Sequence, residues 1–281
     1  MNWSELPDLA AVILLACVFA SISRRRPTRI SRIWLIGWLM IVVHFAAFLF
    51  TKMPGIWGTF AAVVGLIALA WGGTPFMWGS VPNRKENSVW WMLAALLGSI
   101  ALYIPLLVAG PAPGWVLDLA ASLFGLLPLA VALRAMRNSD HSLRWVNVAQ
   151  YYPLSIFLLI VQNRPGNGAA LALNALLFTV YFGCCIHFWR AYRRATAGKF
   201  ITMAGFLAWA LVFVVAPLMT ALWPALHIET QVWNLPKLGY YVVAVGMILL
   251  LLEDQIENDA EAEGVTLSLL EENIQHTKTL N

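Results

Sequence analysis

Four polar side chains inside apolar segments of the sequence are candidates for a functional site: His44, Asp118, Asn174 and His187. Polar and ionisable groups are costly in hydrocarbon, so within membrane segments they usually face an interior cavity or pair with one another. An imidazole grouped with a carboxylate and a carboxamide can bind a small polar ligand, or respond to pH through the histidine. The alternative is that each side chain makes one interhelical hydrogen bond that only fixes packing.

Depth in the membrane decides which of these side chains can meet. With a rise of 1.5 Å per helical residue, His44 and Asn174 each lie about 10 Å from one face of the membrane. Asp118 lies about 5 Å from the same face. We therefore predict that His44, Asp118 and Asn174 form a binding site for a small ligand of unknown identity that opens to this side, which the charge distribution described below predicts to be the outer side.

Two membrane histidines also suggest haem, because two imidazoles can bind one iron. His44, however, lies roughly 17 Å from the other face of the membrane, whereas His187 lies only about 3 Å from it. Helix tilt recovers only part of this difference. We expect neither haem nor any other cofactor.

Motifs of the common soluble enzymes do not occur in the chain. There is no Gly-rich phosphate loop with its Lys, no HExxH and no GxSxG. The three cysteines, Cys17, Cys184 and Cys185, lie in apolar segments and follow no metal-ligand or redox spacing. We therefore expect no metal site, no catalytic residues and no enzymatic activity.

The composition is that of a multi-pass membrane protein. Of the 281 residues, 60% are hydrophobic and only 11% are charged, and soluble domains carry about 25% charged residues. A helix needs roughly 17–25 apolar residues to cross a hydrocarbon core of about 30 Å. We predict an all-α bundle of about nine spans: 8–22, 33–51, 56–78, 89–110, 115–135, 146–162, 167–189, 199–222 and 236–252.

Positive charge predicts the orientation of these spans, because Lys and Arg concentrate in short cytoplasmic loops. With the N-terminus outside and the C-terminus inside, the inner loops hold Arg24, Arg25, Arg26, Arg29, Arg32, Arg84, Lys85, Arg134, Arg137, Arg144, Arg190, Arg193, Arg194 and Lys199. The outer side holds only Lys52, Arg164 and Lys237. The net charge of +4 then indicates contact with anionic lipid and not with nucleic acid. Span 146–162 is the weakest, being short and beginning with Asn147 and Gln150, so a re-entrant segment remains an alternative there.

The last span passes without Pro or Gly into an acidic C-terminal segment. Residues spaced four and three apart from Ile256 form a heptad seam that reaches back to Leu249 in the span. We predict that a membrane bundle, 1–252, continues into a cytoplasmic helical linker, 253–281, that forms a parallel coiled coil in a homodimer. The alternative is a frayed, solvated tail. The seam residues expected to transmit a signal are Leu249, Ile256, Leu267, Leu270 and Ile274.

The segment "VWNLPKLGYYVVAVGMILLLLEDQIE", from Val232 to Glu257, resembles the final membrane helix and exit segment of the polytopic N-terminal sensor regions of bacterial diguanylate cyclases and sensor histidine kinases. The resemblance is close over this segment and only topological over the rest. It implies a bacterial cytoplasmic membrane protein with a cytoplasmic output domain or partner. The chain departs from the family in having no Gly-Gly-Asp-Glu-Phe motif, no phospho-accepting His in its usual context and no ATP-binding domain.

Together these features predict a membrane-embedded sensor that passes a signal through its last helix to a cytoplasmic output domain or partner. The competing hypothesis is a transporter of small molecules or ions. Many carriers consist of two similar halves around a midplane site, whereas nine spans do not divide equally and the sequence has no evident repeat. The sensor hypothesis is therefore the first choice and the transporter the alternative.

Overall fold

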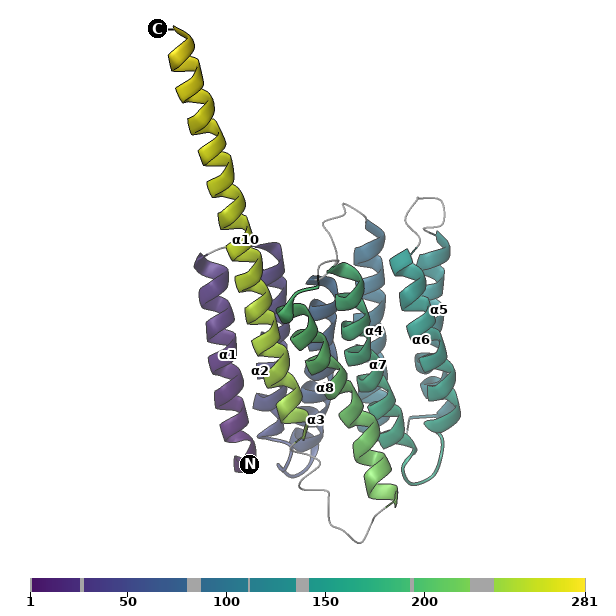
Figure 1. Cartoon of the computed structure of the whole chain (residues 1–281). Coiled ribbons are helices and arrows are strands. Elements are labelled where there is room, and N and C mark those ends of the chain that lie inside the picture. The colour runs from purple at the N-terminus through teal and green to yellow at the C-terminus, as the bar shows by residue number, and fades with distance from the viewer. Residues whose placement is uncertain are drawn as a thin grey trace.

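A computed structural model describes residues 2–25, 28–79, 87–110, 112–134, 142–192, 195–222 and 235–280. These residues form helices and no strand (Figure 1). After a short 3₁₀ helix, η1 (Trp3–Glu5), the α-helices are α1 (Leu6–Arg25), α2 (Arg29–Phe48), α3 (Ile56–Gly79), α4 (Asn87–Val108), α5 (Gly114–Arg134), α6 (Ser142–Val161), α7 (Gly168–Ala191), α8 (Ala197–Leu222) and α10 (Leu235–Leu280). The predicted all-α membrane bundle is confirmed.

Eight of the described helices are long and apolar enough to cross a membrane, and the ninth predicted span is the exception. That span corresponds to α6, whose apolar part, Trp145–Val161, is shorter than the others. Arg144, Asn147 and Gln150 reduce the hydropathy of its first turns. Helix α6 nevertheless packs lengthwise against both α5 and α7 (Figure 1). Within the described residues, nine helices therefore run through the bundle, eight of them strongly apolar and one weaker.

The bundle has two ends of different charge. One end, which we call the basic end, carries Arg24, Arg25, Arg29, Arg32, Arg190 and Lys199 in the first or last turns of α1, α2, α7 and α8. The opposite end carries Lys52 and Arg164. The N-terminus lies at the opposite end and α10 leaves at the basic end (Figure 1). Arg26, Arg84, Lys85, Arg137, Arg193 and Arg194 lie outside the described residues.

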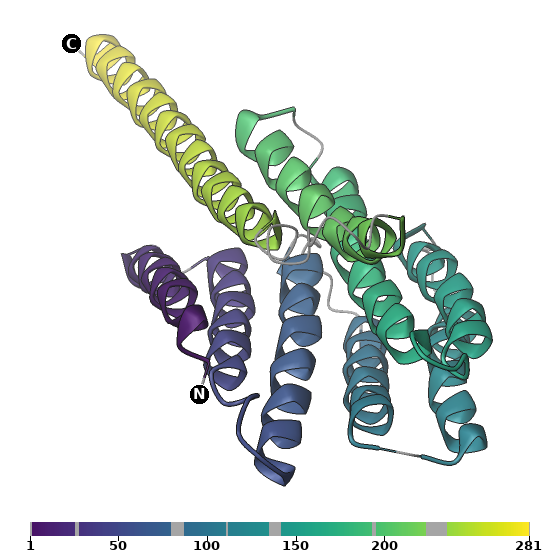
Figure 2. The ribbon, with the colours of Figure 1, turned by 90° about the horizontal axis from the view of Figure 1, so that it is seen from below.

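The helices follow one another around the bundle in an open arc. Helix α2 packs between α1 and α3, and α5 packs between α4 and α6 (Figure 2). Helix α7 contacts α3, α6 and α8, and α10 packs most extensively against α8. Helices α7 and α8 therefore connect the α3–α6 side of the molecule to α10.

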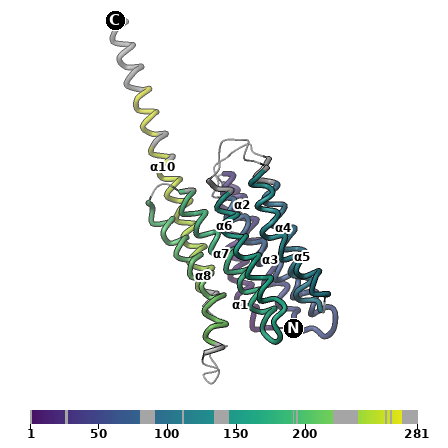
Figure 3. Tube along the Cα trace, turned by 90° about the vertical axis from the view of Figure 1, so that its right-hand side faces the viewer, coloured from purple at the N-terminus to yellow at the C-terminus, as the bar shows by residue number. Residues whose placement is uncertain are grey.

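Helix α10 continues well beyond the bundle as one uninterrupted helix of 46 residues (Figure 3). It passes the predicted boundary at residue 252 without a break, and residues 253–280 add about 42 Å at 1.5 Å per residue. Ile256 and Leu267 on this segment are 70% and 58% exposed. The helical continuation predicted from the sequence is present, and its apolar side chains have no cover within the single chain where the structure describes them.

The charge asymmetry gives a testable orientation. A reporter that is active only in the cytoplasm should work when fused after Leu252 or after Arg137, and it should fail after Gly110. Arg137 lies in an Arg-rich loop and α10 leaves the bundle at the basic end after Leu252, whereas Gly110 follows α4 at the opposite end. Reporter activity in intact cells is the measurement. A working fusion at Gly110 would contradict the predicted crossing pattern.

Candidate functional site

His44 lies at the interface of α2 and α3. Its Nδ1 is 2.8 Å from the carbonyl oxygen of Gly65, and its ring contacts the rings of Phe45 and Phe48. The side chain is only 8% exposed. The hydrogen bond joins two neighbouring helices, which is the packing role that the sequence left open as the alternative to ligand binding.

Asp118 belongs to a separate polar network, at the end of the bundle opposite the basic end. Its Oδ1 accepts hydrogen bonds from Gln162 Nε2, at 2.7 Å, and from Asn163 Nδ2, at 3.0 Å. Gln162 Oε1 in turn accepts a hydrogen bond from the hydroxyl of Tyr103, at 3.0 Å. The network links α4 and α5 to the end of α6.

The structure does not bring the three predicted ligand-binding residues together. His44 is on α2, Asp118 is on α5, and α3 and α4 separate these helices in the arc (Figure 2). Asn174 is half-buried on α7 and takes part in neither hydrogen-bond network. Depth alone placed these residues at similar levels, but the order of the helices puts them at different interfaces. A ligand-binding role for each residue stays a prediction.

The geometry predicts which of these side chains are energetically coupled. In a double-mutant cycle, Asp118→Asn and Gln162→Leu should deviate from additivity by about 0.5–3 kcal/mol, because the two side chains share a hydrogen bond. The pair Asp118→Asn and His44→Ala should be additive within about 0.5 kcal/mol, since the two residues share no partner. Stability of the purified protein in detergent is the readout. Strong coupling between His44 and Asp118 would contradict this arrangement.

His187 lies between α6 and α7, near the basic end. Its Nε2 is 3.2 Å from Asn147 Oδ1, and the side chain is buried. His44 and His187 therefore serve different helix interfaces. Among the residues that the structure describes, no group of three or more His, Cys, Asp or Glu side chains is placed to hold a metal ion.

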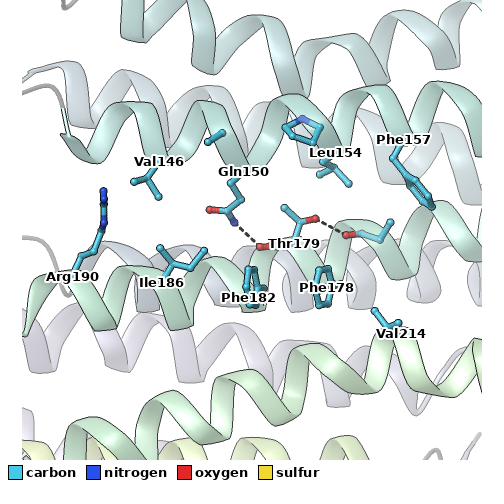
Figure 4. Close-up of a pocket in the computed structure, with 13 residues that line it drawn as sticks. Val146, Gln150, Leu154, Phe157, Phe178, Thr179, Phe182, Ile186, Arg190 and Val214 are labelled. Atoms are coloured by element: carbon cyan, nitrogen blue, oxygen red, sulfur yellow. Dashed lines mark hydrogen bonds between the residues drawn. The ribbon is translucent and has the colours of Figure 1, made fainter.

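A cavity of about 720 Å³ lies between α6, α7 and α8 (Figure 4). This volume is within the range of ligand pockets in proteins, roughly 300–1,000 Å³. Its wall is mostly apolar and is formed by Val146, Ala149, Gln150, Pro153, Leu154, Phe157, Ala175, Phe178, Thr179, Phe182, Ile186, Arg190 and Val214. Arg190 lies at one end of the cavity, near Ile186 and Val146, and Phe157 lies at the other end (Figure 4). The cavity is therefore a long apolar groove with a cation at the basic end.

Gln150 is the main polar side chain along the length of the groove. Its Nε2 donates a hydrogen bond to the carbonyl oxygen of Thr179 (Figure 4), while its buried Oε1 has no hydrogen-bond partner among the described residues. The side chain reaches α7 because residue 183 is glycine, where a Cβ atom would collide with the Gln150 amide. Gln150 is therefore held against α7 partway along the apolar wall of the groove.

Helix α10 is held against α8 by backbone-to-backbone contact at glycines. A Cβ atom at Gly205 of α8 would lie 2.6 Å from Val243 N of α10, and one at Gly246 of α10 would collide with Thr202 N of α8. Gly239 is similarly close to Trp209, where a Cβ atom would lie 2.9 Å from Trp209 Cβ. Small residues of this kind let membrane helices approach closely. At these glycines no flexible side chain therefore lies between the backbones of α8 and α10.

Glu253 marks the point where α10 leaves the bundle. Both of its carboxylate oxygens lie 3.2 Å from the backbone N of Gly198, in the first turn of α8. A carboxylate at this position satisfies an otherwise unpaired N–H group and interacts favourably with the helix dipole. The Glu253 side chain thus ties the exit of α10 to the start of α8.

The face of α10 that contacts α8 has the same seven-residue spacing as the predicted seam. Gly239, Gly246 and Glu253, which contact α8, are seven residues apart, and the same spacing continues through Ala260, Leu267 and Ile274. A straight α-helix drifts about 20° per seven residues relative to such a line, which amounts to about 40° between Glu253 and Leu267 and about 100° between Gly239 and Ile274. The contact face at the exit of the bundle therefore continues into the first part of the seam, and the line turns away from that face farther along the helix.

Sequence reasoning missed both the groove and the glycine contacts. The spacing of seven between Gly198 and Gly205, and again between Gly239 and Gly246, is visible in the sequence and is a signal of close helix packing. The groove has no comparable signal, because it depends on which helices become neighbours.

Comparison of the chain with models of protein families, with curated proteins and with solved structures finds no match.

Proposed function

We propose that this multi-pass membrane protein is the input module of a signalling system, which senses a ligand or a membrane state and passes the signal out through α10. The observation that carries the proposal is the continuity of α10, a single helix of 46 residues that begins inside the bundle and ends far outside it. A helix is stiff over this length, so a displacement at its bundle end reaches its free end.

Helix α8 connects the groove to α10 in this proposal. Val214 of α8 lines the groove, and α8 contacts α10 through glycines and through Glu253. Because packed interfaces tend to switch between discrete arrangements rather than deform smoothly, a small shift of α8 is expected to rotate or translate α10. A ligand in the groove would shift the equilibrium between the two arrangements of α8 and α10 if it binds one arrangement more tightly than the other.

The proposed output is the relative rotation of two α10 helices in a homodimer. Leu249, Ile256, Leu267, Leu270 and Ile274 form the seam, and the described part of it outside the bundle is exposed in the single chain. Two chains inserted in one membrane with the same orientation present these helices in parallel, so that like positions align. A cytoplasmic output domain or partner would respond to this rotation, as the resemblance to sensor regions of bacterial signalling proteins implies.

An insertion series tests the proposal. A diguanylate cyclase domain, which needs a correctly oriented dimer, is fused after Asn281, and one to seven alanines are inserted after Gly264. Each residue rotates the distal helix by about 100°. Cyclase activity should therefore be retained with four or seven insertions, and it should fall to a minimum with two or five.

The same fusion with insertions placed after Asn281, in the junction to the cyclase, is the matched control for linker length. An activity profile that does not depend on the number of insertions after Gly264 would contradict transmission through the helix. That result would favour the transporter alternative.

A further inference from the structure

The groove between α6, α7 and α8 is at least as long as one leaflet of a bilayer. From Val146 to Phe157 its wall follows twelve residues of α6, or roughly 17 Å, and from Ala175 to Arg190 it follows sixteen residues of α7, or roughly 23 Å. Half of a hydrocarbon core of about 30 Å is about 15 Å. The groove therefore extends from the basic end of the bundle past its middle, which leaves room for the whole length of an acyl chain from the leaflet on that side.

The groove is also open to the lipid around the bundle. Ala149 on its α6 wall is exposed, and the side chains of Phe157 and Val214 are 43% and 44% exposed. These residues belong to the membrane-spanning parts of their helices, so their exposed surface faces hydrocarbon and not water. A flexible apolar chain can enter sideways from the bilayer, whereas a polar solute would have to cross hydrocarbon first.

The charge at the end of the groove selects the headgroup. Arg190 lines the groove in the last turn of α7, at the level where phosphates of the same leaflet lie. A guanidinium forms paired, charge-assisted hydrogen bonds with a phosphate. The remaining wall is apolar apart from Gln150 and Thr179. This surface suits an acyl chain and not a second charged group of a ligand.

We infer that this groove is a binding site for an anionic phospholipid of the leaflet at the basic end, with one acyl chain between α6 and α7 and the phosphate at Arg190. The site is independent of whether α10 carries a signal. If the proposed function also holds, the lipid contacts Val214 of α8, so the anionic lipid content of the membrane is a quantity the protein can sense.

The test uses full-length protein in phosphatidylcholine nanodiscs. Two probes with the same photoactivatable acyl chain are compared: phosphatidylglycerol, which is anionic, and phosphatidylcholine, which is zwitterionic. Adducts are located by mass spectrometry of peptides. We expect adducts within residues 146–157 and 175–190, with phosphatidylglycerol preferred. Arg190→Gln should reduce that preference by about fivefold, the effect of one basic residue beside an anionic leaflet.

Matched variants separate the site from general surface charge. Arg24→Gln removes an exposed arginine at the same end of the bundle, on α1, and should leave labelling of the groove unchanged. Ala149→Phe places a bulky side chain in the groove and should abolish labelling there. Ala130→Phe makes the same change at an exposed position of α5, away from the groove, and should not affect it. Thermal stability of each variant shows whether it is folded.

Three results would overturn the inference. One is equal labelling of the groove by the two probes in the wild-type protein, which would mean that the headgroup is not selected. Another is the same loss of preference in Arg24→Gln as in Arg190→Gln, which would mean that the attraction comes from the whole surface. The last is native mass spectrometry that finds a quinone or another neutral lipid bound in place of the phospholipid.

Discussion

Gly205→Ala and Gly246→Ala should each lower the stability of the purified protein by at least about 1–3 kcal/mol, the usual cost of overpacking a tight interface. The methyl group at residue 205 would lie 2.6 Å from Val243 N, and the one at residue 246 would collide with Thr202 N. Both obstacles are backbone atoms, which cannot rotate away as a side chain can. The helices must separate, and α10 would lose its contact with α8.

Gly98→Ala is the matched control. Gly98 also lies within an apolar helix, α4, but a Cβ atom there has no neighbour within 4 Å. Because alanine favours a helix over glycine by roughly 0.5–1 kcal/mol, this variant should be as stable as the wild-type protein or more stable. Thermal unfolding in detergent is the measurement. If Gly205→Ala unfolds at the same temperature as Gly98→Ala, the close α8–α10 contact does not hold.

The membrane helices were predictable because their signal is local. Long apolar segments bounded by charge identify helices regardless of how these pack, and eight of the nine predicted spans are long apolar helices in the structure. The span 146–162 is the weakest by sequence because it is short and begins with Asn147 and Gln150. The structure gives both side chains interhelical partners, the His187 ring for Asn147 and the Thr179 carbonyl for Gln150.

The partners of the polar side chains could not be predicted in the same way, because which helices become neighbours does not follow from the local sequence. Depth along the membrane normal follows from residue counts, and it placed His44, Asp118 and Asn174 at similar levels. Position around the bundle depends on packing, which puts His44 against Gly65 and Asp118 against Gln162. Glycine spacing is the one sequence feature that indicates which helix faces pack closely, as Gly205 and Gly246 show.

The central claim is that α10 forms a parallel seam between two chains outside the membrane. Single cysteines at Leu267, Leu270 and Ile274 should crosslink readily between identical chains, because these seam positions face their counterparts across the dimer. Cysteines at Ser268 and Glu272, on the outer face, should crosslink poorly. Disulfide formation in membranes of a variant lacking Cys17, Cys184 and Cys185 is the measurement, and the difference between the two sets matters more than the total yield. Strong crosslinking at the three seam positions alone is the predicted result, and uniform crosslinking at all five positions, or at none, would contradict it.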